Sequence, residues 1–119
     1  MKELTAQQIK DLLSPIPKKE WMINKFSNGK NKCCFLGHLQ RLHSDNPKDY
    51  TIKNCGEGFF GQKMRTNARE LTEKALIEMY GLYIDGAYVN NSPDYNGYTE
   101  NNPKDRIMHL LDDMIKHGF

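Results

Sequence analysis

Apolar residues recur at the spacing of an amphipathic helix near the end of the chain. Within residues 103–117, five apolar residues fall on one helical face: Ile107, Leu110, Leu111, Met114 and Ile115. Asn102 and Pro103 form a typical helix start, because asparagine accepts hydrogen bonds from free backbone N–H groups and proline fits the first turn. We therefore predict a helix from residue 103 to about residue 117.

Three more helices are predicted earlier in the chain. Thr5 and Gln8 have the spacing of a capping box, which predicts a short helix that ends before two nearby prolines. Apolar residues at helical spacing predict a second helix over about residues 32–43. A third helix is predicted over residues 66–80, with Gly81 in the position where helices commonly end.

Two segments have the pattern of short strands. Apolar and polar residues alternate over residues 20–26, around Trp21. An Asn-Gly pair, which favours a tight turn, follows this segment. Residues 82–89 surround an Asp-Gly pair that is typical of a hairpin. The sequence therefore predicts an α+β fold, with three to four helices packed with a small antiparallel β-sheet, in a single compact domain over residues 1–119.

Residues 90–102 are almost wholly polar and predict an exposed loop before the last helix. Loops of this length are often functional. Rigid aromatic rings among polar neighbours suit protein interfaces. Tyr95, Asn96 and Tyr98, together with Asn91, are therefore the candidate partner-binding residues.

Charge is unevenly distributed along the chain, although the formal net charge is only +2. Residues 1–65 carry 12 Lys/Arg against 6 Asp/Glu, whereas residues 66–119 carry 5 against 9. Basic residues flank Trp21 and Phe26, a mixture that can hold single-stranded nucleic acid by charge and stacking. Ordinary solvated charge is the favoured interpretation, because the basic residues are dispersed. Single-stranded nucleic-acid binding is kept as a further alternative.

No stretch of the sequence is apolar over the length needed to span a bilayer, and the N-terminal residues lack the apolar run of a signal peptide. We therefore expect a cytoplasmic protein that does not bind membranes. Its three cysteines are an odd set, unsuited to a disulfide framework, so reduced thiols are expected.

Cys33 and Cys34 stand at a predicted helix start, where free N–H groups and the helix dipole can stabilise a thiolate nucleophile. A base would come from elsewhere in the fold, with His109 or His38 as the candidates. A cysteine-dependent hydrolase or transferase that uses Cys33 or Cys34 with His109 is therefore the alternative function. Core packing is the favoured interpretation of Cys34, because cysteine is among the most buried residue types.

Three further motifs match known ligand sites only in part. The glycines of residues 56–61 have the spacing of a dinucleotide-binding turn, but no buried strand precedes them. Cys34 and His38 are four residues apart but lack the paired spacing of a zinc site. Residues 92–103 can be aligned with a calcium loop, yet the last acidic ligand is missing. Neither a metal nor a cofactor is predicted.

The order of these features resembles a loosely defined family of small bacterial and bacteriophage proteins. Its pattern is a tryptophan segment, a cysteine-leucine-glycine helix, an asparagine-containing turn and a C-terminal amphipathic helix. The corresponding residues here are Trp21, the Cys34-to-Leu39 stretch, Val89-Asn90-Asn91 and residues 106–115. This chain departs from the pattern at His38, where the family has a small residue, and at Asn91, where it has an aspartate.

The resemblance implies a compact domain of phage or mobile-element origin and carries no catalytic residue over to this chain. Small proteins of that origin often bind and modulate host machinery. Together with the polar loop, this favours a non-enzymatic protein-binding domain, a phage-encoded modulator or inhibitor of a host process.

Overall fold

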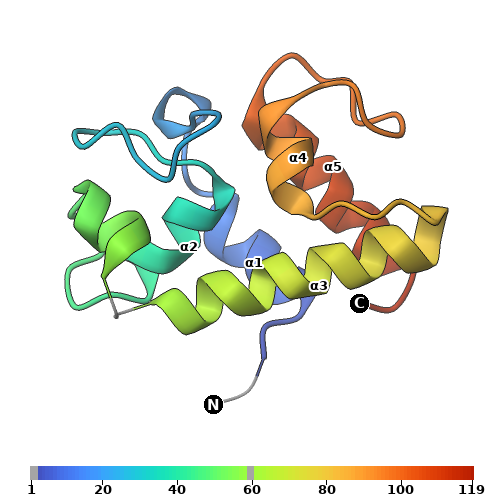
Figure 1. Ribbon diagram of the computed structural model, residues 1–119, viewed down its shortest axis with the longest axis horizontal. Coiled ribbons are helices and arrows are strands. Elements are labelled where there is room, and N and C mark those ends of the chain that lie inside the picture. Colours follow the sequence, from blue (N-terminus) through green and yellow to red (C-terminus); the bar gives the residue numbers. More distant parts are fainter. Residues whose placement is uncertain (1–2, 59–60) are drawn as a thin grey trace.

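A computed structural model describes residues 3–58 and 61–119, and the regular secondary structure of these residues is almost entirely helical (Figure 1). Helices account for 56% of the described residues, and strand or bridge for 3%. In chain order the elements are α1 (Ala6–Leu13), the 3₁₀ turn η1 (Lys18–Glu20), α2 (Phe35–Leu42), the π-helical turn η2 (Lys53–Glu57), α3 (Gln62–Tyr80), α4 (Gly86–Asn91) and α5 (Pro103–Lys116).

The two helix starts predicted from the capping residues Thr5 and Asn102 are confirmed. Thr5 and Gln8 form the reciprocal capping box, with Gln8 N 3.2 Å from Thr5 Oγ1 and Thr5 N 2.9 Å from Gln8 Oε1. Asn102 Oδ1 accepts a hydrogen bond from Asp105 N at 2.9 Å, and proline occupies the first turn of α5. The third predicted helix begins four residues before Thr66, at Gln62.

The predicted antiparallel sheet is wrong, and with it the α+β class. Within residues 3–58 and 61–119, β pairing is limited to two isolated bridges, in which Cys33 pairs with Trp21 and with Ser27. The backbone at Asn24 has a φ of 68°, in the left-handed region, so a regular strand does not continue through this residue. Residues 21–33 therefore form an irregular loop against α2.

The predicted hairpin over residues 82–89 is also wrong, because Asp85 caps a helix. Its side chain accepts a hydrogen bond from Ala87 N at 2.8 Å, and α4 starts at Gly86. A Cβ atom at Gly86 would lie 2.8 Å from the ring of Phe35, so glycine allows α4 to pack closely on α2. The Asp-Gly pair thus starts a helix and allows two helices to pack closely.

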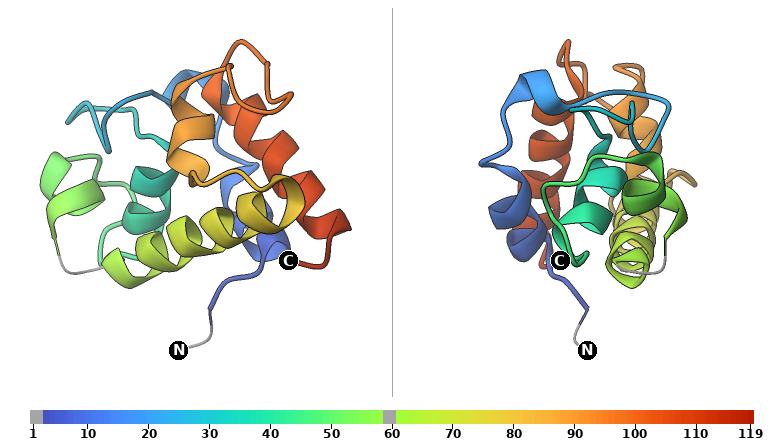
Figure 2. Two further views of the ribbon diagram at one scale, coloured as in Figure 1. Left: turned by 45° about the vertical axis from the view of Figure 1, so that its right-hand side comes forward. Right: turned by 90° about the vertical axis from the view of Figure 1, so that its left-hand side faces the viewer.

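α2 is the central helix of the fold, and all of its residues from Phe35 to Arg41 are buried. It contacts α1, α3, α4 and η2, and Figure 2 shows it between them. α5 packs against α1 and α4 on the other side of the core. The start of α1 lies beside the last residue, because Ala6 N donates a hydrogen bond to Phe119 O at 3.1 Å.

Three polar side chains of α2 are buried and hold the irregular segments beside it. Arg41 donates from Nε to His38 Nδ1 at 3.1 Å, so the other ring nitrogen of His38 carries the proton and donates to Glu20 O at 2.8 Å. Arg41 also donates to Pro47 O, and its guanidinium lies 4.1 Å from the centre of the Tyr50 ring. On the same helix, Gln40 donates to Gly58 O at 3.0 Å.

We expect the free energy of unfolding to fall as the pH drops from 6.5 towards 3, because of His38. Burial, aided by the positive charge of Arg41, lowers the pKa of His38 from 6.5 to about 3. Below pH 6.5 the unfolded chain therefore binds a proton that the folded chain does not, at a cost of about 1.4 kcal/mol per pH unit. Urea unfolding at pH 7 and pH 5 should show a difference of about 2 kcal/mol from this group.

The exposed His117 supplies the control for this expectation. The difference should persist in His117→Gln and shrink in His38→Gln, measured against each variant's own stability at pH 7. An equal difference in all three proteins would contradict a neutral buried His38.

Candidate functional site

Residues 92–101 connect α4 to α5 at one end of the molecule, and we call them the clamped loop (Figure 1). Short-range hydrogen bonds shape this loop from within. Ser92 Oγ and Asp94 Oδ2 are 2.8 Å apart, and Tyr98 N donates to Tyr95 O at 2.9 Å. Asn96, at the tip, has a φ of 47°, which reverses the chain direction.

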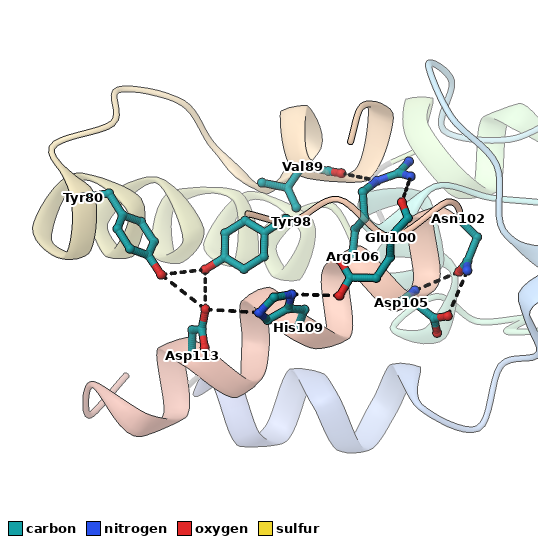
Figure 3. A network of polar contacts seen from close by, with 9 residues as sticks. All are labelled: Tyr80, Val89, Tyr98, Glu100, Asn102, Asp105, Arg106, His109 and Asp113. Carbon is teal, nitrogen blue, oxygen red and sulfur yellow. Dashed lines mark hydrogen bonds and ion pairs between the residues drawn. The ribbon is translucent and has the colours of Figure 1, made fainter. Parts of the chain in front are cut away.

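Arg106 of α5 binds both ends of the clamped loop (Figure 3). Its guanidinium donates from Nε to Val89 O at 2.9 Å and from Nη2 to Asn90 O at 2.7 Å, at the end of α4. Its third nitrogen, Nη1, donates to Glu100 O at 2.7 Å, where the loop returns to α5. Arg106 is only 4% exposed, so these charge-assisted bonds are shielded from water. The loop thus has fixed ends.

Tyr98 anchors the clamped loop in the core. Its side chain is 1% exposed, and its hydroxyl donates to Asp113 Oδ2 at 2.8 Å (Figure 3). Tyr80 reaches the same carboxylate oxygen at 3.2 Å. Burial raises the pKa of Tyr98, so its hydroxyl keeps its proton. The predicted partner-binding residue Tyr98 is thus inside the fold rather than at the surface, because an amphipathic ring in a polar loop can turn inward when an acceptor such as Asp113 lies within reach of its hydroxyl.

His109 belongs to the same network (Figure 3). Its Nδ1 lies 2.8 Å from Glu100 Oε2, its Nε2 lies 3.7 Å from Asp113 Oδ2, and its ring packs edge-on against Tyr98 with centroids 4.7 Å apart. Two carboxylates and a tyrosine therefore surround this ring. His109 thus supports the base of the loop.

The described contacts do not bring His109 to either candidate nucleophile. Cys33 Sγ contacts Cys55 Sγ at 3.2 Å, and Cys34 Sγ accepts a hydrogen bond from Gly37 N at 3.4 Å. Among the residues that the structure describes, neither thiol forms a hydrogen bond with a histidine. The catalytic combination of Cys33 or Cys34 with His109 stays a prediction without geometric support.

Cys34 lines a cavity of about 300 Å³ beside the start of α2. Its lining includes Phe26 and Leu36, together with the basic residues Lys25 and Arg69. Burial raises the pKa of the Cys34 thiol even though backbone N–H groups at the helix start oppose the shift. Desolvation therefore outweighs the helix N-terminus, and the thiol stays protonated at neutral pH.

The surface of this region carries a tyrosine pair formed by Tyr88 and Tyr95. Their rings pack edge-to-face with centroids 5.9 Å apart, and Tyr88 is 47% exposed. Asn96 is exposed beside them, whereas Asn91 is partly buried and accepts a hydrogen bond from Asn24 N at 2.8 Å. Sequence reasoning missed Tyr88 because it fell in the predicted hairpin. A helical interpretation of residues 86–91 would have placed it about 100° around the helix from the buried Val89.

Two of the alternative sites can be compared with the structure, a metal site and a nucleic-acid surface around Trp21. The part of the chain described by the structure contains no group of three or more His, Cys, Asp and Glu side chains arranged to hold a metal ion. Trp21 is 4% exposed and donates through its indole N–H to Ile16 O, so its ring is covered rather than open to a base. None of the helices in the described ranges is long and apolar enough to cross a membrane.

No protein-family model, curated protein sequence or solved structure matches this chain. The case for function therefore rests on the geometry of the chain's own residues.

We expect Arg106→Met to lower the free energy of unfolding by about 3 kcal/mol or more, because two buried carbonyl groups and one partly buried carbonyl group lose their donors. The same change should speed hydrogen exchange at the Tyr98 amide, which is bonded within the loop. Arg69→Met, on the exposed side of α3, is the control and should change stability by less than about 0.5 kcal/mol. Unchanged exchange at Tyr98 in Arg106→Met would show that the loop does not depend on this side chain.

Proposed function

We propose that this chain is a non-enzymatic protein-binding domain that contacts its partner through the tyrosine pair and the tip of the clamped loop. The observation that carries the proposal is an aromatic pair at the surface, with Tyr88 exposed and Tyr95 partly buried, on a backbone whose ends are bound by a buried arginine. Aromatic side chains that stay partly in water on a rigid support are typical of interaction surfaces.

Rigidity is the physical reason that the clamped loop suits binding. A loop that must order itself on contact loses conformational entropy, and this loss weakens the complex. Here Arg106 and Tyr98 order the loop before any partner arrives. Tyrosine adds a large contact area at low entropic cost, because it has only two side-chain torsions.

The polar neighbours of the tyrosine pair fit the rim of a protein interface. Asp94 and Asn96 are exposed on the loop and can hydrogen-bond a partner or bridging water. The resemblance to small phage and bacterial proteins supplies the biological setting of this proposal, a phage-encoded modulator of a host process. A modulator of this kind needs a stable surface and no catalytic centre.

The test is affinity capture from native host lysate with the wild-type chain and with Tyr88→Ala/Tyr95→Ala. Proteins that bind this surface should be retained by the wild type and lose binding by about 30-fold or more with the double variant, since aromatic hot spots contribute about 2 kcal/mol or more. Both rings are at least partly exposed, so circular dichroism and thermal unfolding should show a folded variant.

Ile52→Ala is the matched control, because Ile52 is 49% exposed and directly precedes η2. Figure 1 shows η2 (green) far from α4 and the clamped loop (orange). Binding of the captured partners should be unchanged in Ile52→Ala. If every captured protein binds the folded double variant as well as the wild type, the tyrosine pair is not the contact surface.

A further inference from the structure

Cys33 and Cys55 lie side by side in the interior, although 22 residues separate them in sequence. Their sulfur atoms are 3.2 Å apart, and both residues are 0% exposed. A disulfide bond has an S–S length of about 2.05 Å, so an approach of about 1 Å would join them. The third cysteine, Cys34, is not part of this contact.

We propose that Cys33 and Cys55 are a redox-active pair that a hydroperoxide converts into an intramolecular disulfide. The pair is a modification site separate from the clamped loop, so this proposal does not depend on the proposed protein-binding function.

The backbone holds both cysteines in place before any bond forms. Cys33 N donates to Glu20 O at 3.0 Å, and Cys33 O accepts from Met22 N at 3.0 Å. On the other side, Cys55 N donates to Thr51 O at 3.0 Å within the turn that forms η2. Two thiols held together in this way react with each other faster than thiols on mobile segments.

The environments of the two sulfur atoms give them different roles. The hydrogen bond from Cys33 lowers the pKa of Cys55, with smaller contributions from Ser27 and Arg41. The same contact and burial raise the pKa of Cys33. Cys55 is therefore the more acidic thiol of the pair, so we assign it the attack on the oxidant, and Cys33 is the thiol that resolves the product.

The reaction proceeds in two balanced steps. The Cys55 thiol loses its proton and the thiolate attacks the outer oxygen of a hydroperoxide, the O–O bond breaks, and the departing oxygen takes up that proton and leaves as an alcohol or water while Cys55 becomes a sulfenic acid. Cys33 sulfur then attacks Cys55 sulfur, the S–O bond breaks, and water leaves with the Cys33 proton. The two thiols are oxidised by two electrons, and the hydroperoxide is reduced.

The disulfide would connect the loop before α2 to η2. Neither segment belongs to an α-helix, and the residue next to each, Glu20 or Gly58, is hydrogen-bonded to a side chain of α2. Closing residues 33–55 into a ring removes conformations from the unfolded chain. The oxidised protein should therefore melt several degrees higher than the reduced protein.

The experiment treats the folded, reduced chain with hydrogen peroxide, then denatures it, alkylates free thiols and digests it with trypsin. Cleavage at lysine and arginine separates peptide 33–41, which contains Cys33 and Cys34, from peptide 54–63, which contains Cys55. We expect these two peptides to be linked, with one thiol left to alkylate and two hydrogen atoms lost from the intact mass.

Cys34→Ser is the matched variant, because it removes the neighbouring thiol and leaves the proposed pair intact. The link between the peptides should persist in Cys34→Ser and disappear in Cys33→Ser. The Cys34→Ser result alone identifies Cys33 as the partner of Cys55, so the test holds even if Cys33→Ser does not fold.

Three results would overturn the proposal. These are three alkylatable thiols after peroxide treatment, a link that is lost in Cys34→Ser, and a link that forms only when peroxide is added after denaturation. Thermal unfolding of the oxidised and reduced Cys34→Ser proteins gives an independent measurement, and an unchanged or lower melting temperature on oxidation would contradict the expected stabilisation.

Discussion

The fold depends on the burial of α2, a helix that carries His38, Gln40 and Arg41 into the core. Buried polar side chains destabilise a protein unless they find hydrogen-bond partners. Here the partners include backbone carbonyl groups of irregular segments, at Glu20 and Gly58. One set of contacts therefore satisfies the central helix and holds the segments that surround it.

The same relation between a helix and an irregular segment recurs at the proposed binding surface. Arg106 projects from α5 and gives its donors to carbonyl groups on both sides of the clamped loop (Figure 3). Tyr98 adds a buried anchor, and His109 joins the carboxylates below it. The polar interior of this end of the molecule thus has a mechanical role, which is to keep the outward-facing tyrosine pair on a rigid base. The cysteine pair is the corresponding feature beside α2, where a covalent bond could add to the hydrogen bonds that already hold η2.

Sequence reasoning located the long helices and the polar loop, and it erred where local signals have two structural uses. An Asp-Gly pair suits a hairpin turn, but Asp85 is also a good helix cap and Gly86 permits contact with Phe35. Alternation around Trp21 suits a strand, yet a strand needs a neighbouring strand to satisfy its backbone, and the side chains of α2 fill part of that role instead. In the loop, Tyr95 is partly exposed whereas Tyr98 is buried, and no local sequence pattern predicts this difference.

Local chemistry determined the helix starts, because a cap such as Thr5 with Gln8 or Asn102 with Asp105 closes hydrogen bonds over three residues. Periodic apolar residues likewise determined which face of α5 would be buried. The tertiary structure alone decided the contacts that matter for the proposed functions. Arg106 meets carbonyl groups 16 and 17 residues away, and Cys33 meets Cys55 across 22 residues. Such pairs are chosen by how the helices pack around α2, and packing depends on the shape of the whole core rather than on any short stretch of residues.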